Sequence, residues 1–150
     1  MLAEKLGELA LSDVERVAGG LHIASRLISA ATARAVRGQE ISAAEATFIL
    51  KLKQGLGSPS QIATCLGLDP SNVSRMMRNL EARGLVRRSM VEENRARISV
   101  TLTDAGEAAA SQVAPAIRHA ESAVLAALDE DEIKQMRRWL ERVCLGVERE

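Results

Sequence analysis

The sequence has few aromatic residues and few cysteines. Its 150 residues include one Phe, one Trp and no Tyr, so a packed core must be built from aliphatic side chains. The two cysteines, Cys65 and Cys144, form no Cys-x-x-Cys pair, which excludes a disulfide scaffold and predicts a reduced, cytoplasmic protein. We expect Cys65 to be a core thiol and Cys144 an interface thiol, because each lies beside an apolar helical stripe. A cysteine-based, redox-responsive regulator is an alternative.

Signatures of membrane proteins, metalloproteins and enzymes are also missing. No apolar run reaches the roughly 18 residues of a membrane span, and Glu4, Lys5 and Glu8 interrupt the leucines of any N-terminal signal peptide. The two histidines, His22 and His119, are not spaced as metal ligands, so neither a metal nor a cofactor is expected. Because there is no glycine-rich phosphate loop and no nucleophile elbow, we expect the protein not to be an enzyme.

Charge is distributed unevenly along a chain whose formal net charge is zero. Residues 1–57 carry seven Lys/Arg against six Asp/Glu, residues 58–103 carry seven against four, and residues 104–150 carry six against ten. The three segments therefore have net charges of +1, +3 and −4. Attraction to double-stranded DNA would come from a local positive field in the middle segment rather than from a basic protein overall.

Residues 58–84 contain the signals for two short helices joined by a tight turn. Ser58 can cap a helix, and Gln61 three residues later predicts a capping box. The same order of signals then repeats, which is the arrangement of a helix-turn-helix. The further signals are a glycine that breaks the first helix (Gly67), a cap followed by proline for the second (Asp69, Pro70) and a closing glycine (Gly84).

The second of these helices is predicted to have two distinct faces. Val73, Met77 and Leu80 recur at helical spacing and must face a core. The opposite face is polar and basic, and such a face can read base edges in the major groove, where a guanidinium pairs with guanine. A solvated helix face is the alternative interpretation. The candidates on this face, with the asparagines that flank it, are Ser71, Asn72, Ser74, Arg75, Arg78 and Asn79.

The periodicity changes after the second helix. Residues 97–102 alternate between polar and apolar types, which predicts a half-buried strand, and residues 85–91 supply an antiparallel partner. Residues 92–95 are left as the tip of this hairpin. An arginine near such a tip can enter the adjacent minor groove, and both Arg95 and Arg97 are candidates. Surface solubility is the alternative role for these two arginines.

The segments DPSNVSRMMRNLEARGLVRR and ISVTLTDAG resemble parts of the MarR family of bacterial winged helix-turn-helix regulators. Leu102, Thr103 and Gly106 match the Leu-Thr-x-x-Gly entry into a long helix in that family. The family's wing commonly carries Asp-x-Arg or Asp-Arg, whereas this chain has Glu-Glu-Asn-Arg-Ala-Arg. The resemblance therefore does not decide whether Arg95 or Arg97 is the arginine that reaches the minor groove. The predicted fold is mainly α with a small β-hairpin wing (α+β): a winged helix-turn-helix domain at 41–103, flanked by helical dimerisation regions at 1–37 and 104–150.

Amphipathic helices are predicted on both sides of this segment. Ser42 and Glu45 form a capping box for a helix that buries Phe48 or Ile49, and a long helix from residue 104 carries an apolar stripe to Leu128. The terminal helices have apolar stripes that a small DNA-reading core cannot cover, so we predict a homodimer on a pseudo-palindromic operator, with recognition helices roughly 34 Å apart. The interface candidates are Leu6, Leu9, Val14, Val17, Ile133, Met136, Leu140, Val143 and Val147.

The predicted function is transcription regulation, with repression released by a small ligand. The resemblance implies a phenolic or lipophilic acid as effector, and His22 and Arg26, four residues apart, could bind its carboxylate, unless they are surface or dimer-contact residues. The first short helix would hold DNA phosphate through Ser58, Ser60 and Gln61. The alternative from another class is a winged-helix protein–protein interaction module that does not read DNA.

Overall fold

The structure, a computed structural model, describes residues 11–91 and 94–147, and the side chains of residues 11–90 and 98–146. Helices dominate this part of the chain, and a two-stranded antiparallel hairpin interrupts them, so the predicted α+β class is confirmed. The elements are α2 (Asp13–Ala35), α3 (Ala43–Lys53), α4 (Pro59–Leu66), α5 (Pro70–Ala82), β1 (Val86–Val91), β2 (Asn94–Leu102), α6 (Asp104–Val124) and α7 (Glu130–Val147).

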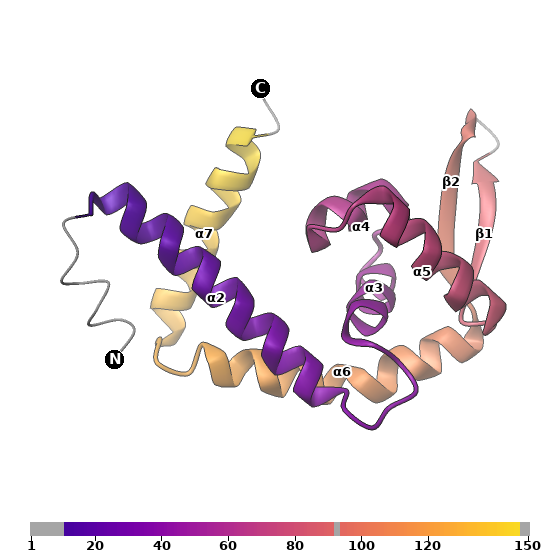
Figure 1. Cartoon of the computed structure of the whole chain (residues 1–150), viewed down its shortest axis with the longest axis horizontal. Coiled ribbons are helices and arrows are strands. Elements are labelled where there is room, and N and C mark those ends of the chain that lie inside the picture. Colours follow the sequence, from indigo (N-terminus) through magenta and orange to yellow (C-terminus); the bar gives the residue numbers. More distant parts are fainter. Residues whose placement is uncertain (1–10, 92–93, 148–150) are drawn as a thin grey trace.

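The elements are arranged in two groups that α6 connects. Helices α3, α4 and α5 gather with the hairpin at one end of α6, and α7 turns back from the other end (Figure 1). Helix α2 packs along α6, which also contacts α3 and β2. The long helices therefore extend away from the small domain formed by α3, α4, α5 and the hairpin.

The starts of the helices follow from side chains that cap free backbone N–H groups. The capping box predicted for α3 is confirmed, because the backbone N–H of Ser42 donates to Glu45 Oε2 over 2.9 Å and that of Glu45 donates to Ser42 Oγ over 3.2 Å. At α4 the helix begins after Ser58 as predicted, but the capping box with Gln61 is wrong. The Ser58 hydroxyl instead forms a 2.9 Å hydrogen bond with that of Ser60, so it does not cap the helix.

The turn between α4 and α5 depends on glycine and aspartate. Gly67 ends α4 with φ of 60°, a left-handed conformation that costs glycine little. Asp69 then begins α5, where its carboxylate accepts from the backbone N–H groups of Ser71 and Asn72. Gly84, with φ of 69°, follows the end of α5 and turns the chain into β1. The end of α4 and both ends of α5 are therefore confirmed where the sequence predicts them.

The hairpin is longer than the sequence pattern predicts. Strand β2 begins at Asn94, which pairs with Val91, so residues 94 and 95 belong to the strand rather than to the tip. The register is irregular between Met90 and Val91, and Met90 pairs with Ile98. The side chains of Met90 and Ile98 are both exposed. The half-buried strand predicted from the sequence is found near the base of the hairpin, where Val100 is buried.

An aliphatic core holds the small domain together, as the shortage of aromatic residues predicts. The sequence predicts that α3 buries Phe48 or Ile49, and in the structure both side chains are fully buried. The prediction of a core thiol at Cys65 is wrong, because that side chain is exposed. Other buried members of this core are Ile62, Val73, Met77, Leu80, Val86 and Val100.

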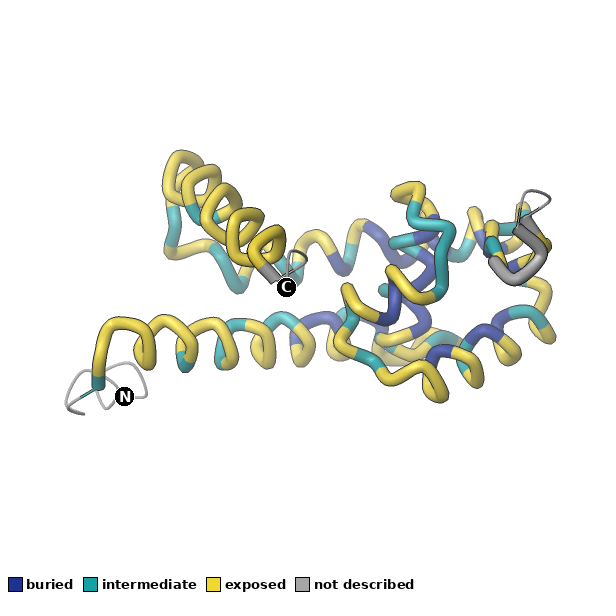
Figure 2. The backbone as a smooth tube through the Cα atoms, turned by 90° about the horizontal axis from the view of Figure 1, so that it is seen from above, coloured by how far each residue is buried: buried dark blue, intermediate teal, exposed yellow. Residues whose placement is uncertain are grey.

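The long helices leave much apolar surface uncovered. Helix α6 ends at Val124, so the predicted continuation to Leu128 is wrong, and Leu128 lies in the connection to α7. Figure 2 shows α7 and the N-terminal half of α2 exposed over most of their length. A second buried cluster, which includes Val113 and Ile117, fastens α6 to α3 and to the end of α2. No helix in the described part of the chain is both long and apolar enough to cross a membrane.

Candidate nucleic-acid interface

Helix α5 presents the predicted polar face to solvent. Val73, Met77 and Leu80 are buried on its inner side, whereas Ser71, Ser74, Arg75 and Arg78 are exposed, as the periodicity predicts. Ser74 and Arg78 have no hydrogen-bonding or ionic partner among the described residues. An exposed row of hydroxyl and guanidinium groups on a helix about 10–12 Å wide has the chemistry and the size to enter a major groove.

The first turn of α5 is organised around the carboxylate of Asp69. Its Oδ1 accepts from the backbone N–H groups of Ser71 over 3.0 Å and Asn72 over 3.1 Å, and both side chains also donate to Asp69. The hydroxyl of Ser71 and the backbone N–H of Asn72 are the main causes that hold the pKa of Asp69 below its ordinary value. Arg75 Nη2 in turn donates to Asn72 Oδ1 over 2.9 Å. Asn72 is therefore engaged within the helix before any DNA binds.

The other end of α5 is tied to α3 through a buried carboxylate. The Nδ2 of Asn79 donates to Glu45 Oε1, and Arg83 Nη1 lies 3.5 Å from the same oxygen. The Nη2 group of Arg83 donates to the carbonyl of Glu40, in the connection between α2 and α3. The sequence identifies Glu45 only as a capping residue, since nothing local indicates contacts with residues 34 and 38 positions away.

The residues predicted to hold phosphate lie at the start of α4. Ser60 and Gln61 are exposed and Ser58 is half-buried. Because Ser58 does not cap this helix, the first backbone N–H groups of α4 have no capping side chain among the described residues. Such N–H groups, at the positive end of a helix, can bind a phosphate oxygen.

The hairpin carries the predicted wing arginines and a further basic pair. Arg95 and Arg97 are in β2, but their side chains lie outside the described residues. On β1, Arg88 pairs with Glu81 of α5, and this hydrogen-bonded contact lowers the pKa of Glu81 and raises that of Arg88. The ion pair joins β1 of the hairpin to α5. The neighbouring Arg87 is exposed and, in the part of the chain described, unpaired.

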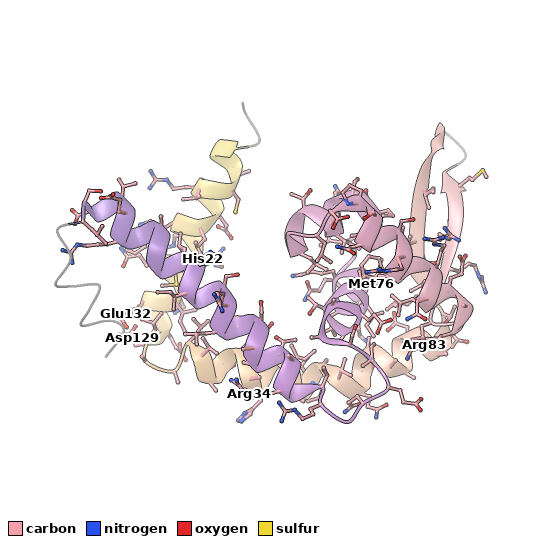
Figure 3. The ribbon with its side chains drawn as sticks, viewed as in Figure 1. His22, Arg34, Met76, Arg83, Asp129 and Glu132 are labelled. Atoms are coloured by element: carbon pink, nitrogen blue, oxygen red, sulfur yellow. The ribbon has the colours of Figure 1, made fainter. Side chains whose placement is uncertain are left out.

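The effector residues predicted from sequence lie away from the cavity between the two long helices α2 and α6. His22 and Arg26 are exposed on α2, and neither lines the surface cavity of about 510 Å³ between α2 and α6. The polar side chains at that cavity are Arg34, near the C-terminal end of α2, and His119 of α6. Figure 3 shows His22 about midway along α2, away from Arg34. The remaining lining residues are apolar: Ala31, Ala35, Ala116, Ala120, Ala123 and Val124.

The predicted dimer contacts are exposed wherever their side chains are described, except that Met136 is half-buried. Val14 and Val17 on α2 are 78% and 62% exposed, and Val143 on α7 is 57% exposed. Ile133, Met136, Leu140 and Cys144 line an apolar groove of about 360 Å³ on α7. Leu6 and Leu9 lie outside the described residues, as does the side chain of Val147.

Comparisons with known proteins show which family and which solved structures this chain resembles. The model of the MarR family matches residues 52–97, from the end of α3 into β2. The structure of AbsC, a MarR family transcriptional regulator from Streptomyces coelicolor, is similar with 20% identity and a TM-score of 0.74, over 95% of this chain and 99% of that one. No curated protein matches the chain.

Two further solved structures have the same fold. A MarR variant from E. coli, complexed with operator DNA, is 17% identical over 91% of this chain and 99% of that one, with a TM-score of 0.71. BpsR from Bordetella bronchiseptica, whose DNA binding is regulated by 6-hydroxynicotinic acid, is 21% identical over 86% and 98%, with a TM-score of 0.70. The resemblance to the MarR family is thus confirmed, and the chain has the winged helix-turn-helix fold of MarR-family transcriptional regulators.

Proposed function

We propose that this protein is a homodimeric, sequence-specific DNA-binding transcriptional regulator, a repressor that a small ligand releases from a pseudo-palindromic operator. One observation carries the proposal: the exposed face of α5 holds Ser74, Arg75 and Arg78 directly opposite its buried apolar face. The net charge of +3 in residues 58–103 adds a local attraction for phosphate. The same fold occurs in a MarR variant that was solved with operator DNA.

Each group at the interface has a distinct role in this proposal. Arg78 is unpaired among the described residues and is the candidate for base reading, because a guanidinium can donate two hydrogen bonds to guanine. Asn72, held by Asp69 and Arg75, presents a fixed rather than a mobile polar surface. The start of α4 binds phosphate through its backbone N–H groups and the hydroxyls of Ser58 and Ser60. Arg95 and Arg97 are the wing residues for the minor groove.

A second copy of the chain is the proposed cover for α2 and α7. Val14, Val17 and Val143 are largely exposed, and large exposed apolar patches on a soluble domain commonly mark an interaction surface. Pairing these helices in a symmetric dimer would bury them and place two recognition helices about one turn of DNA apart, roughly 34 Å. A reduced cytoplasm is the proposed compartment, where Cys65 and Cys144 stay free thiols.

The effector we propose is a small aromatic acid. It would bind preferentially to a form of the dimer whose two recognition helices are spaced so that they do not fit the operator. BpsR, which has the same fold, is regulated by an aromatic acid. In this chain Arg34 and His119 lie at an otherwise apolar cavity, and that combination suits a carboxylate on a ring. His22 and Arg26 remain the sequence-based alternative. A thermal-shift screen of aromatic acids, repeated with Arg34→Ala and with Arg26→Ala, separates the two sites by which variant loses the response.

DNA reading is tested with duplexes selected by the purified protein from a randomised pool. The wild type should enrich a pseudo-palindrome and bind it less tightly as salt rises, since binding releases counterions. Arg75→Ala and Arg78→Ala should each weaken that binding, whereas Arg118→Ala, which removes an exposed arginine from α6, should not. Unchanged affinity in both α5 variants, together with no dependence on salt, would favour the protein–protein interaction module instead.

A further inference from the structure

Glu45 divides its two carboxylate oxygens between two elements. Oε2 accepts from the backbone N–H of Ser42 and completes the capping box of α3. Oε1 faces α5, where it accepts from Asn79 Nδ2 and lies 3.5 Å from Arg83 Nη1. Glu45 is 8% exposed, whereas its partners Asn79 and Arg83 both reach solvent, so the carboxylate is buried at the inner end of a part-buried cluster. One buried carboxylate thus joins the start of α3 to the last two turns of α5.

The same cluster also reaches the chain that leaves the long helix α2. Arg83 donates through Nη2 to the carbonyl of Glu40, two residues before Ser42. Arg83 is also the residue that follows the last helical residue of α5. A shift of α5 along or around its axis would therefore break contacts with both α3 and the connection from α2. The apolar contacts beneath α5 resist separation of the helices, but they are non-directional and do not fix its rotation as closely.

We propose that Glu45 is a positioning residue, which together with Asn79 and Arg83 sets the orientation of the recognition helix against α3 and the α2–α3 connection. The inference rests on the proposed function, because orientation matters only if α5 reads DNA. It assigns the Asn79 side chain to the contact with Glu45, not to base reading. It also gives a route by which movement of α2 reaches the reading face, since Arg83 is bound to both sides of the cluster.

The test reverses the polarity of the Glu45–Asn79 contact. Asn79→Asp places a second carboxylate against Glu45 and should turn α5 away from it. Adding Glu45→Gln to the same chain should restore the contact. The new amide can accept the capping hydrogen bond through its oxygen, and its nitrogen can donate to the carboxylate introduced on α5. Glu45→Gln alone should have a small effect, since the amide of Asn79 can turn over and accept. The matched control combines Asn79→Asp with Glu81→Gln. This pair has the same net charge as Asn79→Asp with Glu45→Gln, but its second substitution removes the carboxylate that contacts Arg88 instead of the one that contacts residue 79.

Two measurements are made on the full chain. Affinity is measured for the duplex that the wild type selects from a randomised pool, and backbone-amide residual dipolar couplings give the orientation of α5 relative to α3 without DNA. Asn79→Asp should lower affinity about tenfold or more and tilt α5, since two like charges brought together repel each other. The Glu45→Gln pair should recover to within about threefold of the wild type, and the Glu81→Gln pair should not.

The outcomes distinguish failure of the positioning role of Glu45 from failure of the proposed DNA-binding function. Loss of affinity that Glu45→Gln fails to restore means that Asn79 contacts DNA directly, and the positioning role is wrong. An unaltered orientation of α5 in Asn79→Asp overturns it as well. If the wild type selects no duplex, the proposed function fails, yet the dipolar couplings still show whether Glu45 orients α5.

Discussion

A methyl group on the Cα of Gly106 would lie 1.9 Å from the carbonyl oxygen of Leu85. Gly106 is buried in the first turn of α6, and Leu85 directly precedes β1. The same carbonyl accepts a 3.1 Å hydrogen bond from the backbone N–H of Thr103, whose hydroxyl donates to the carbonyl of Gly84 over 2.6 Å. The start of α6 is thereby fixed against the base of the wing, which is the physical reason for glycine in the Leu-Thr-x-x-Gly pattern.

Replacing Gly106 by alanine should therefore be strongly destabilising. The added carbon would overlap a backbone atom that cannot rotate away, so we expect the free energy of unfolding to fall by about 3 kcal/mol. Urea denaturation measures the loss. Gly20→Ala is the control, because it lies on α2 with open space around its Cα, and alanine there should be neutral or stabilising by up to about 1 kcal/mol. Equal stability of the two variants would contradict the close approach.

The boundaries of α5 could be predicted from sequence because their causes are local. Asp69 caps the helix through N–H groups two and three residues away, and Gly84 ends it through its own backbone conformation. The buried and exposed faces followed from the 3.6-residue period alone. The capping box of Ser42 and Glu45 has an equally local cause, because the two residues are three positions apart.

Features that depend on packing between distant segments could not be predicted in this way. The contact of Asn79 with Glu45 joins residues that are 34 positions apart, so no local pattern indicates it, and the sequence predicts Asn79 beside the DNA-reading face instead. Cys65 precedes a half-buried leucine, but the core side of α4 is set by Ile62 and Ala63. One residue turns a helix by about 100°, which is enough to place Cys65 in solvent.

Arg78→Ala should change which sequences the protein prefers. If Arg78 reads a base, the variant should lose about 1–3 kcal/mol at one position of each half-site while the other positions keep their preferences. Arg95→Ala, at the wing, should instead weaken binding to all sequences more evenly. Selection from a randomised pool with each variant separates these patterns. Identical preferences for the wild type and Arg78→Ala would exclude base reading by that residue.

A charge placed on the apolar face of α7 should disrupt the proposed dimer. Leu140→Glu introduces a carboxylate into the groove that Ile133 and Met136 line, so association and DNA affinity should fall together. Sedimentation at several protein concentrations measures the association. Arg138→Gln makes the same change in net charge at an exposed site of α7 and should leave the dimer intact. A dimer of Leu140→Glu that is as stable as the control would place the interface elsewhere.

The stability that Glu45 contributes should depend on pH in the acid range. Burial by itself would raise the pKa of this carboxyl, but hydrogen bonds from Ser42 and Asn79 and the charge of Arg83 together lower it. A carboxyl whose pKa is lower in the folded state stabilises the fold above its unfolded pKa, about 4.3, and loses that contribution as the pH falls through the folded value.

Comparing the wild type with Glu45→Gln isolates this carboxylate from others whose pKa values are also lowered, such as Asp69 and Glu81. At neutral pH the wild type should be more stable by about 1 kcal/mol, because the variant keeps the capping bond but lacks the charge that faces Arg83. The difference should shrink below about pH 4.3 and vanish once Glu45 is protonated in the folded protein. Urea denaturation at steps between pH 7 and pH 3 follows it. A difference that stays constant over that whole range would mean that Glu45 acts through its shape and hydrogen bonds alone, with no contribution from its charge.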